Sequence, residues 1–155
     1  MRPRRMFRRG RPADPLFTPG ECLYFRCLSD WVNPNGHVKP ANVRFPDQSV
    51  NRQKYSKAGD VLIPDDEPKS PEWIFWGVAR LTVGEIPGDI LTSGGVMYAF
   101  SVEHDPREDN YGHSELRVYK NGARERNSKK INEGVKKKYR TDLALRTRVV
   151  VKAVV

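Results

Sequence analysis

Cysteine is scarce in this chain, and long apolar runs are missing. The two cysteines, Cys22 and Cys27, match no zinc-binding spacing, and within a strand their side chains would point to opposite faces. They predict reduced thiols and a cytoplasmic location instead of a disulfide framework. No run of about 18 apolar residues is present, which excludes a membrane-spanning helix. No apolar stretch follows the basic start, which argues against a secretory signal peptide.

Motifs of the common catalytic folds are missing as well. The chain has no P-loop and no GxGxxG, GxSxG or HExxH pattern. No cofactor and no metal site is therefore predicted, and the motifs do not decide whether the chain is an enzyme. A length of 155 residues suits one domain. With 37% hydrophobic and 30% charged residues, part of the chain is expected to lie outside the core.

What the sequence does have is segregated charge. Residues 1–12 contain six arginines and no acid, and residues 117–155 contain 13 Lys or Arg against three acids. Because the net charge is +9, residues 13–116 carry −7. A basic head and tail therefore flank an acidic body. Blocks of this kind usually contact a polyanion, most often nucleic acid, either DNA or RNA.

The head is predicted to be an extended basic arm over residues 1–19. Four prolines oppose a helix, and no apolar periodicity is present. Such an arm has the reach to follow a phosphate backbone, or to lie across an acidic protein surface. The residues of the arm predicted to bind nucleic acid are Arg2, Arg4, Arg5, Arg8, Arg9 and Arg11.

The remainder, residues 20–155, is predicted to form a single β-rich α+β domain. Apolar or alternating residues predict strands at 22–28, 73–83, 96–102 and 113–120, with shorter ones at 43–45 and 60–63. Asn33–Gly36 and Asn121–Gly122 predict turns. Residues 48–58 are polar and predict a loop, as do 64–71 and 103–112. Trp31, Trp73 and Trp76 are interpreted as core or interface anchors, and Tyr98 and Phe100 as core.

One helix is predicted, over residues 127–139. Ile131, Val135 and Tyr139 form a narrow apolar stripe at helical spacing. Residues 143–155 alternate in polarity and predict a terminal strand. Basic side chains occupy the rest of the helix surface, and those predicted to bind nucleic acid are Lys129, Lys130, Lys136, Lys137, Lys138 and Arg140.

The loop of residues 103–113 is the densest group of functional side chains. Three interpretations remain open. It is a solvated hairpin loop, or a metal site of His104, Asp109 and His113, or it presents His113 as an isolated acid–base or anion-binding group. A second group is Tyr24, Arg26, Ser49 and Arg52. Arg26 interrupts an apolar strand, so its guanidinium is either paired with a body acid or aimed into a pocket.

A family resemblance links these two groups. Leu23-Tyr24-Phe25-Arg26, the turn from Val32 to Gly36, and the segment 45–50 ending in Ser49-Val50 resemble small bacterial proteins. In those proteins LYRRV, a short turn and an SV segment occur in the same order. Residues 109–115 resemble their DN-x-x-H-x-E segment. No activity is established for them, so the resemblance implies only that Arg26, Ser49, Asn110 and His113 share one site.

Three functions follow as hypotheses. The first is a nucleic-acid-associated binding module that uses the basic arm and the Lys-rich helix. The second is a subunit of a larger protein assembly or homo-oligomer, held by its arm. The third is a small enzyme acting on a nucleotide or polynucleotide, with His113, Arg26, Arg52 and Asn110 as catalytic residues. None of the three involves a membrane.

Overall fold

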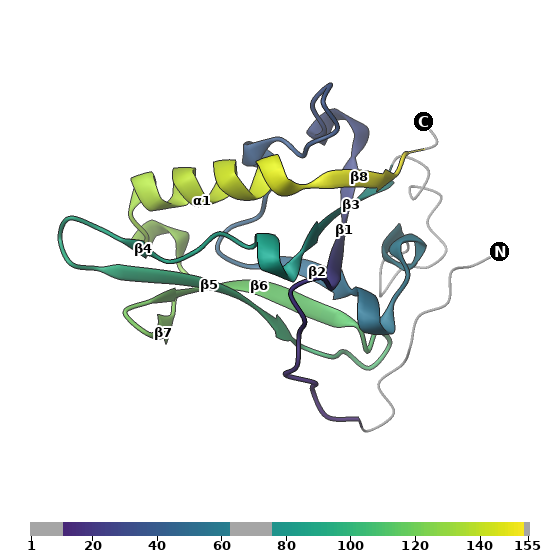
Figure 1. Ribbon diagram of the computed structural model, residues 1–155, viewed down its shortest axis with the longest axis horizontal. Helices are drawn as coiled ribbons and strands as arrows, with labels where there is room; N and C mark the ends of the chain where they lie inside the picture. Colours follow the sequence, from purple (N-terminus) through teal and green to yellow (C-terminus); the bar gives the residue numbers. More distant parts are fainter. Residues whose placement is uncertain (1–10, 63–75, 154–155) are drawn as a thin grey trace.

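A computed structural model describes residues 11–62 and 76–153 (Figure 1). The described residues form one curled antiparallel sheet of eight strands in the order β4-β5-β6-β2-β1-β3-β8, with β7 paired to β6. The strands are β1 (Cys22–Leu28), β2 (Gln48–Arg52), β3 (Trp76–Thr82), β4 (Ile90–Leu91), β5 (Met97–His104), β6 (His113–Lys120), β7 (Ala123–Arg124) and β8 (Arg148–Val151). The α+β class and the single β-rich domain are as predicted.

The two faces of the sheet have different roles, and β1 shows the division. Leu23, Phe25 and Cys27 are buried in the hydrophobic core. Because side chains alternate along a strand, Tyr24 and Arg26 point to the opposite face. The same alternation in β6 places Leu116 and Val118 in the core. One face is therefore the core, and the other is available for polar side chains.

The α-helix in the described part of the chain, α1 (Glu133–Arg146), covers the core face. Asn132 caps it, because its side chain accepts a hydrogen bond from the Val135 amide. Ile131, Val135 and Tyr139 are buried, as predicted. The predicted start at residue 127 is wrong, because Ser128–Lys130 form a separate 3-10 helix and α1 begins at Glu133. The helix continues beyond the predicted end because Leu143 extends the same stripe at i+4. The terminal strand is correspondingly limited to β8.

Short 3-10 helices connect the strands. They are η1 (Ser29–Trp31), η2 (Pro40–Asn42), η3 (Gln53–Tyr55), η4 (Ala58–Leu62), η6 (Val83–Glu85) and η7 (Ser128–Lys130). The predicted strand at 60–63 is in η4 as far as residue 62, and residues 43–45 are not a strand. The predicted loop 48–58 contains β2. This strand is largely polar, and its Asn51 and Arg52 are buried because they pair with residues distant in the sequence. Residues 64–71, part of the strand predicted at 73–83, and Trp73 lie outside the described residues.

Several local predictions are confirmed. The strands at 22–28 and 113–120 have the predicted bounds, and the strand predicted at 96–102 is found as β5, displaced toward His104. The Asn33–Gly36 turn closes with a hydrogen bond from the Gly36 amide to the Asn33 carbonyl. Asn121 and Gly122 both have positive φ, of 49° and 83°, as a tight hairpin turn requires. Both cysteines are free thiols.

Candidate functional site

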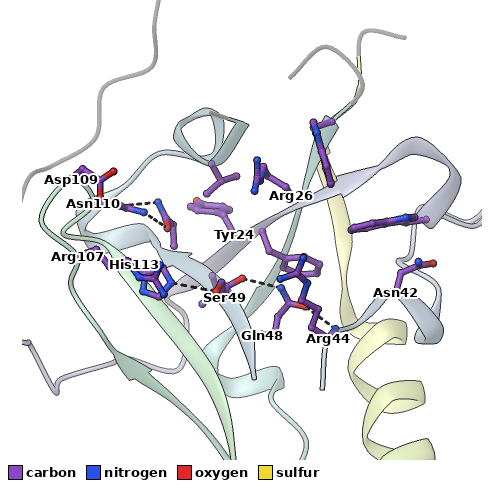
Figure 2. A pocket seen from close by; sticks show the side chains of 16 residues that line it. Tyr24, Arg26, Asn42, Arg44, Gln48, Ser49, Arg107, Asp109, Asn110 and His113 are labelled. Atoms are coloured by element: carbon purple, nitrogen blue, oxygen red, sulfur yellow. Dashed lines mark hydrogen bonds between the residues drawn. The ribbon is translucent and has the colours of Figure 1, made fainter. Parts of the chain in front are cut away.

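A cleft of about 480 Å³ lies on the polar face of the sheet (Figure 2). β1 and β2 supply much of it, with Trp76 from β3 and the turn between β5 and β6 (Figure 2). The described residues that line it are Tyr24, Phe25, Arg26, Trp31, Asn42, Arg44, Gln48, Ser49, Val50, Asn51, Val61, Trp76, Arg107, Asp109, Asn110 and His113. Three are arginines and one is an acid, so the cleft has an excess of positive charge within an acidic body.

Aromatic rings form one part of the cleft. Trp31 and Trp76 meet edge to face, with ring centroids 5.3 Å apart and planes at 86°. The Arg26 guanidinium lies over the Trp76 ring, 5.0 Å from its centroid. Both tryptophans are half-buried, so part of each ring faces the cleft. Trp31 and Trp76 were predicted as core or interface anchors, and only the folded chain shows that they face a cleft.

The opposite part is built by β2 and β6. Asn51 lies opposite His113 in the antiparallel register. Two hydrogen bonds join the Asn51 and Asn110 amides, at 2.9 and 3.2 Å. Reciprocal backbone bonds between Arg107 and Asn110 close the turn that carries Asn110. These contacts fix Asn110 and leave the Arg107 side chain on the cleft wall.

His113 is almost fully buried and holds two hydrogen bonds. Its Nδ1 donates to the Asp105 carbonyl at 2.8 Å, and its Nε2 lies 3.3 Å from Ser49 Oγ. Burial lowers the pKa of His113, and the nearby Arg107 charge acts in the same direction. The imidazole is therefore neutral at pH 7.

The cleft brings together most of the residues that the sequence assigned to a shared site. Tyr24, Arg26, Ser49, Asn110 and His113 all line it. Trp31, Trp76, Arg44 and Arg107 were not assigned to it. Arg107 lies within the functional loop, so its charge was a usable signal. Arg44 lay in the short strand predicted at 43–45, and nothing in that segment indicated a binding residue.

The structure does not place Arg52 in the cleft. Arg52 is three positions after Ser49 in β2, and a strand has a two-residue period, so its side chain points to the core face. There it is fully buried and forms a bidentate ion pair with Glu21, both bonds at 2.9 Å. It also donates to the carbonyls of Asp14 and Leu16 and stacks on the Phe17 ring. Arg52 thus fastens residues 14–17 to the sheet.

The described part of the arm, residues 11–19, contains no helix or strand and is held to the domain. The Asp14 amide donates to His104 Nδ1 at 2.8 Å, and the Tyr111 hydroxyl donates to the Pro12 carbonyl at 2.6 Å. Arg11 lies over the Tyr111 ring. Hydrogen bonds from Lys54 and Tyr55 hold the pKa of the Asp14 carboxyl well below its usual range. Residues 11–14 of the arm are therefore held against the domain.

These contacts also bear on the metal-site interpretation. His104 ends β5 on the core face, where its nitrogens contact the Asp14 amide and the Tyr111 carbonyl. His113 faces the cleft instead. Within residues 11–62 and 76–153, no three His, Cys, Asp or Glu side chains are grouped as a metal ion would require. His104, Asp109 and His113 do not converge.

The two buried histidines predict how stability depends on pH. Burial lowers the pKa of both His104 and His113 below the ordinary value of 6.5. As pH falls below that value, the unfolded chain binds more protons than the folded one, so stability decreases. Each histidine contributes a slope of up to about 1.4 kcal/mol per pH unit. Urea unfolding between about pH 5 and 7.5 measures the slope, and His104→Gln should reduce it. An unchanged slope in that variant contradicts the prediction.

The basic residues predicted to bind nucleic acid differ in their surroundings. Arg2, Arg4, Arg5, Arg8 and Arg9 lie outside the described residues. Lys129, Lys130, Lys137 and Lys138 are exposed. Lys136 donates to Ser128 Oγ, and Arg140 donates twice to the Val43 carbonyl, which ties α1 to the segment that carries Arg44. Arg140 therefore has a structural contact beside any role in binding.

Comparison with models of protein families, with curated proteins and with solved structures gives no match. The resemblance to small bacterial proteins stays a prediction. No helix among the described residues is long and apolar enough to cross a membrane. Functional inference therefore rests on the geometry of the cleft and on the distribution of charge.

Proposed function

We propose that the protein binds single-stranded nucleic acid and that the cleft holds one or two of its nucleotides. The observation that carries the proposal is the combination of two half-exposed tryptophans with three arginines in one cleft. Proteins that bind single strands combine aromatic surfaces for bases with a positive groove for the backbone. The cleft has both elements.

The aromatic part suits an unpaired base. A base that stacks on Trp31 or Trp76 exchanges water for an aromatic face, which every base can do. In a duplex the base faces are already stacked on each other, so a cleft of about 480 Å³ favours single strands. Asn42 also lines the cleft and carries an amide suited to a base edge. The proposal therefore predicts weak sequence preference and strong preference for single strands.

The charged part suits phosphate. Arg26, Arg44 and Arg107 line the cleft, and guanidinium groups bind phosphate oxygens bidentately. Asp109 is the acid among the described lining residues. The net positive lining attracts a polyanion although residues 13–116 carry −7. The arginines distinguish the cleft from the rest of the body.

The experiment that tests the proposal is titration of a fluorescent single-stranded oligonucleotide at several salt concentrations, followed by anisotropy. Replacing Arg26, Arg44 and Arg107 together by Ala should weaken binding and flatten the log–log salt slope by about 2, because each single-strand phosphate contact contributes about 0.7. The control variant Lys57→Ala, Arg126→Ala, Lys152→Ala removes the same charge elsewhere. Equal losses in both variants would reduce the effect to net charge and contradict a role for the cleft.

The basic arm gives a further prediction. Deleting residues 2–10 should leave the melting temperature unchanged, because the deletion retains the contacts of Arg11, Pro12 and Asp14 with the domain. It should also lower oligonucleotide affinity and flatten the salt slope by up to about 3.5, since it removes five arginines. Deleting residues 2–17 should also destabilise the domain, because Arg52 then loses the Asp14 and Leu16 carbonyls. If deleting 2–10 abolishes self-association but spares oligonucleotide binding, the arm serves assembly.

A further inference from the structure

Ser49 and His113 line the cleft and form a hydrogen-bonded chain with Asp105. Ser49 Oγ lies 3.3 Å from His113 Nε2, and His113 Nδ1 lies 2.8 Å from the Asp105 carbonyl oxygen. The residues come from β2, from β6 and from the turn between β5 and β6. Ser49 is exposed, whereas His113 is buried beside it, with 3% of its surface accessible (Figure 2). An accessible hydroxyl therefore rests against a fixed imidazole.

The partners of His113 determine its tautomer. A carbonyl oxygen can only accept a hydrogen bond, so Nδ1 must carry the proton. In the neutral ring Nε2 then presents its lone pair to the Ser49 hydroxyl. This is the arrangement that a general base requires of a serine nucleophile, and a separation near 3.3 Å is usual before substrate binds.

Asp105 supplies a second contribution. Its carboxylate Oδ2 lies 3.7 Å from His113 Nδ1, in addition to the carbonyl contact. A negative charge at that distance favours the imidazolium that forms when the ring accepts a proton. Asp105 therefore holds the ring in one tautomer through its carbonyl and stabilises the charged form through its side chain. It is a positioning residue, because it acts through His113.

We propose that Ser49 is a nucleophile that attacks phosphorus in a phosphate ester or anhydride whose leaving group departs as a stable anion. Ser49 Oγ forms a bond to phosphorus, its proton passes to His113 Nε2, and the leaving group departs with the electron pair of the broken P–O bond. Water then attacks phosphorus from the other side. The Ser49 oxygen leaves with the proton held by His113, and the proton of the attacking water passes to solvent.

The lining of the cleft supports phosphorus over an acyl carbon. Arg26, Arg44 and Arg107 line the same cleft, and guanidinium groups stabilise the charge on phosphoryl oxygens during transfer. In an in-line displacement the leaving group departs opposite the nucleophile, away from His113. A leaving group that needs no proton therefore fits this site. The substrate class rests on the proposed function, because the same three arginines bind phosphate in both proposals.

The test uses two probes with the full chain: a fluorophosphonate that labels activated serines, and bis(p-nitrophenyl) phosphate, which releases a coloured anion. The wild type should be labelled at Ser49 in peptide mass spectra and should release nitrophenolate. Ser49→Ala should not be labelled, and its hydrolysis rate should be lower by at least about 100-fold. Ser101→Ala, on strand β5 at the far side of β6, is the matched control and should change neither the label nor the hydrolysis rate.

His113→Gln should suppress labelling of Ser49, and its melting temperature checks that the buried site remains folded. Oligonucleotide binding is measured on the same samples. Binding that persists in a wild type with neither label nor hydrolysis overturns the nucleophile and leaves the proposed function standing. Labelling of Ser49 without oligonucleotide binding overturns the proposed function instead. Equal hydrolysis by wild type and Ser49→Ala also overturns the nucleophile.

Discussion

Replacing Arg52 by Met is expected to cause the largest loss of stability among single substitutions. Arg52 is fully buried, and its removal leaves the Glu21 carboxylate buried without its bidentate partner. Breaking one side of a buried ion pair costs about 3–5 kcal/mol, or roughly 6–20 °C in melting temperature for a chain of this size. The carbonyls of Asp14 and Leu16 lose their donors in the same variant. Thermal unfolding followed by circular dichroism measures the shift.

Two controls separate burial from simple charge loss. Lys138→Ala breaks an exposed i,i+4 pair with Asp142 and should cost no more than about 0.5 kcal/mol. The double variant Glu21→Leu, Arg52→Met removes both charges and should be more stable than Arg52→Met alone. If Arg52→Met melts like the wild type, Arg52 does not fasten residues 14–17 to the sheet.

Replacing Trp76 by Ala is expected to cause the largest loss of oligonucleotide binding among single substitutions in the cleft. Trp76 faces the cleft beside Trp31 and also carries the Arg26 guanidinium on its ring. Loss of one base–aromatic stack costs about 1–3 kcal/mol, which corresponds to roughly 5- to 150-fold in affinity. Anisotropy titration at fixed salt measures the change.

The salt dependence identifies the cause of that loss. Trp76 carries no charge, so its replacement should leave the slope of log affinity against log salt nearly unchanged, in contrast to the triple arginine variant. Trp76→Phe keeps an aromatic face and should recover much of the affinity. Full affinity in Trp76→Ala would show that bases do not stack on this ring.

The elements that were predictable are those whose pattern is local. The apolar run of 22–28, the alternation of 113–120 and the stripe of Ile131, Val135 and Tyr139 each indicated an element that the structure contains. β2 was missed because its side chains apart from Val50 are polar, and Asn51 and Arg52 are buried only through distant partners. Arg52 pairs with Glu21, and Asn51 pairs with Asn110, 59 positions away. No short-range pattern reports such pairs.

The site was predictable to a similar extent. Arg26 was recognisable as a charge in an apolar strand, and a resemblance in motif order connected it with Ser49, Asn110 and His113. Arg52 was assigned to the same group, although a spacing of three from Ser49 within a strand puts its side chain on the opposite face of the sheet. Trp31 and Trp76 meet only because the chain brings η1 against β3. Their shared role in the cleft is therefore a tertiary property.

The most direct test of the proposed function is to map ultraviolet crosslinks to a single-stranded oligonucleotide containing 5-iodouracil. Bound bases stacked in the cleft should give adducts on Trp31, Trp76 or Tyr24, and an unlabelled competitor strand should suppress them. Adducts confined to the Lys-rich segment 129–138, with none in the cleft, would contradict the assignment of the cleft as the nucleic-acid site.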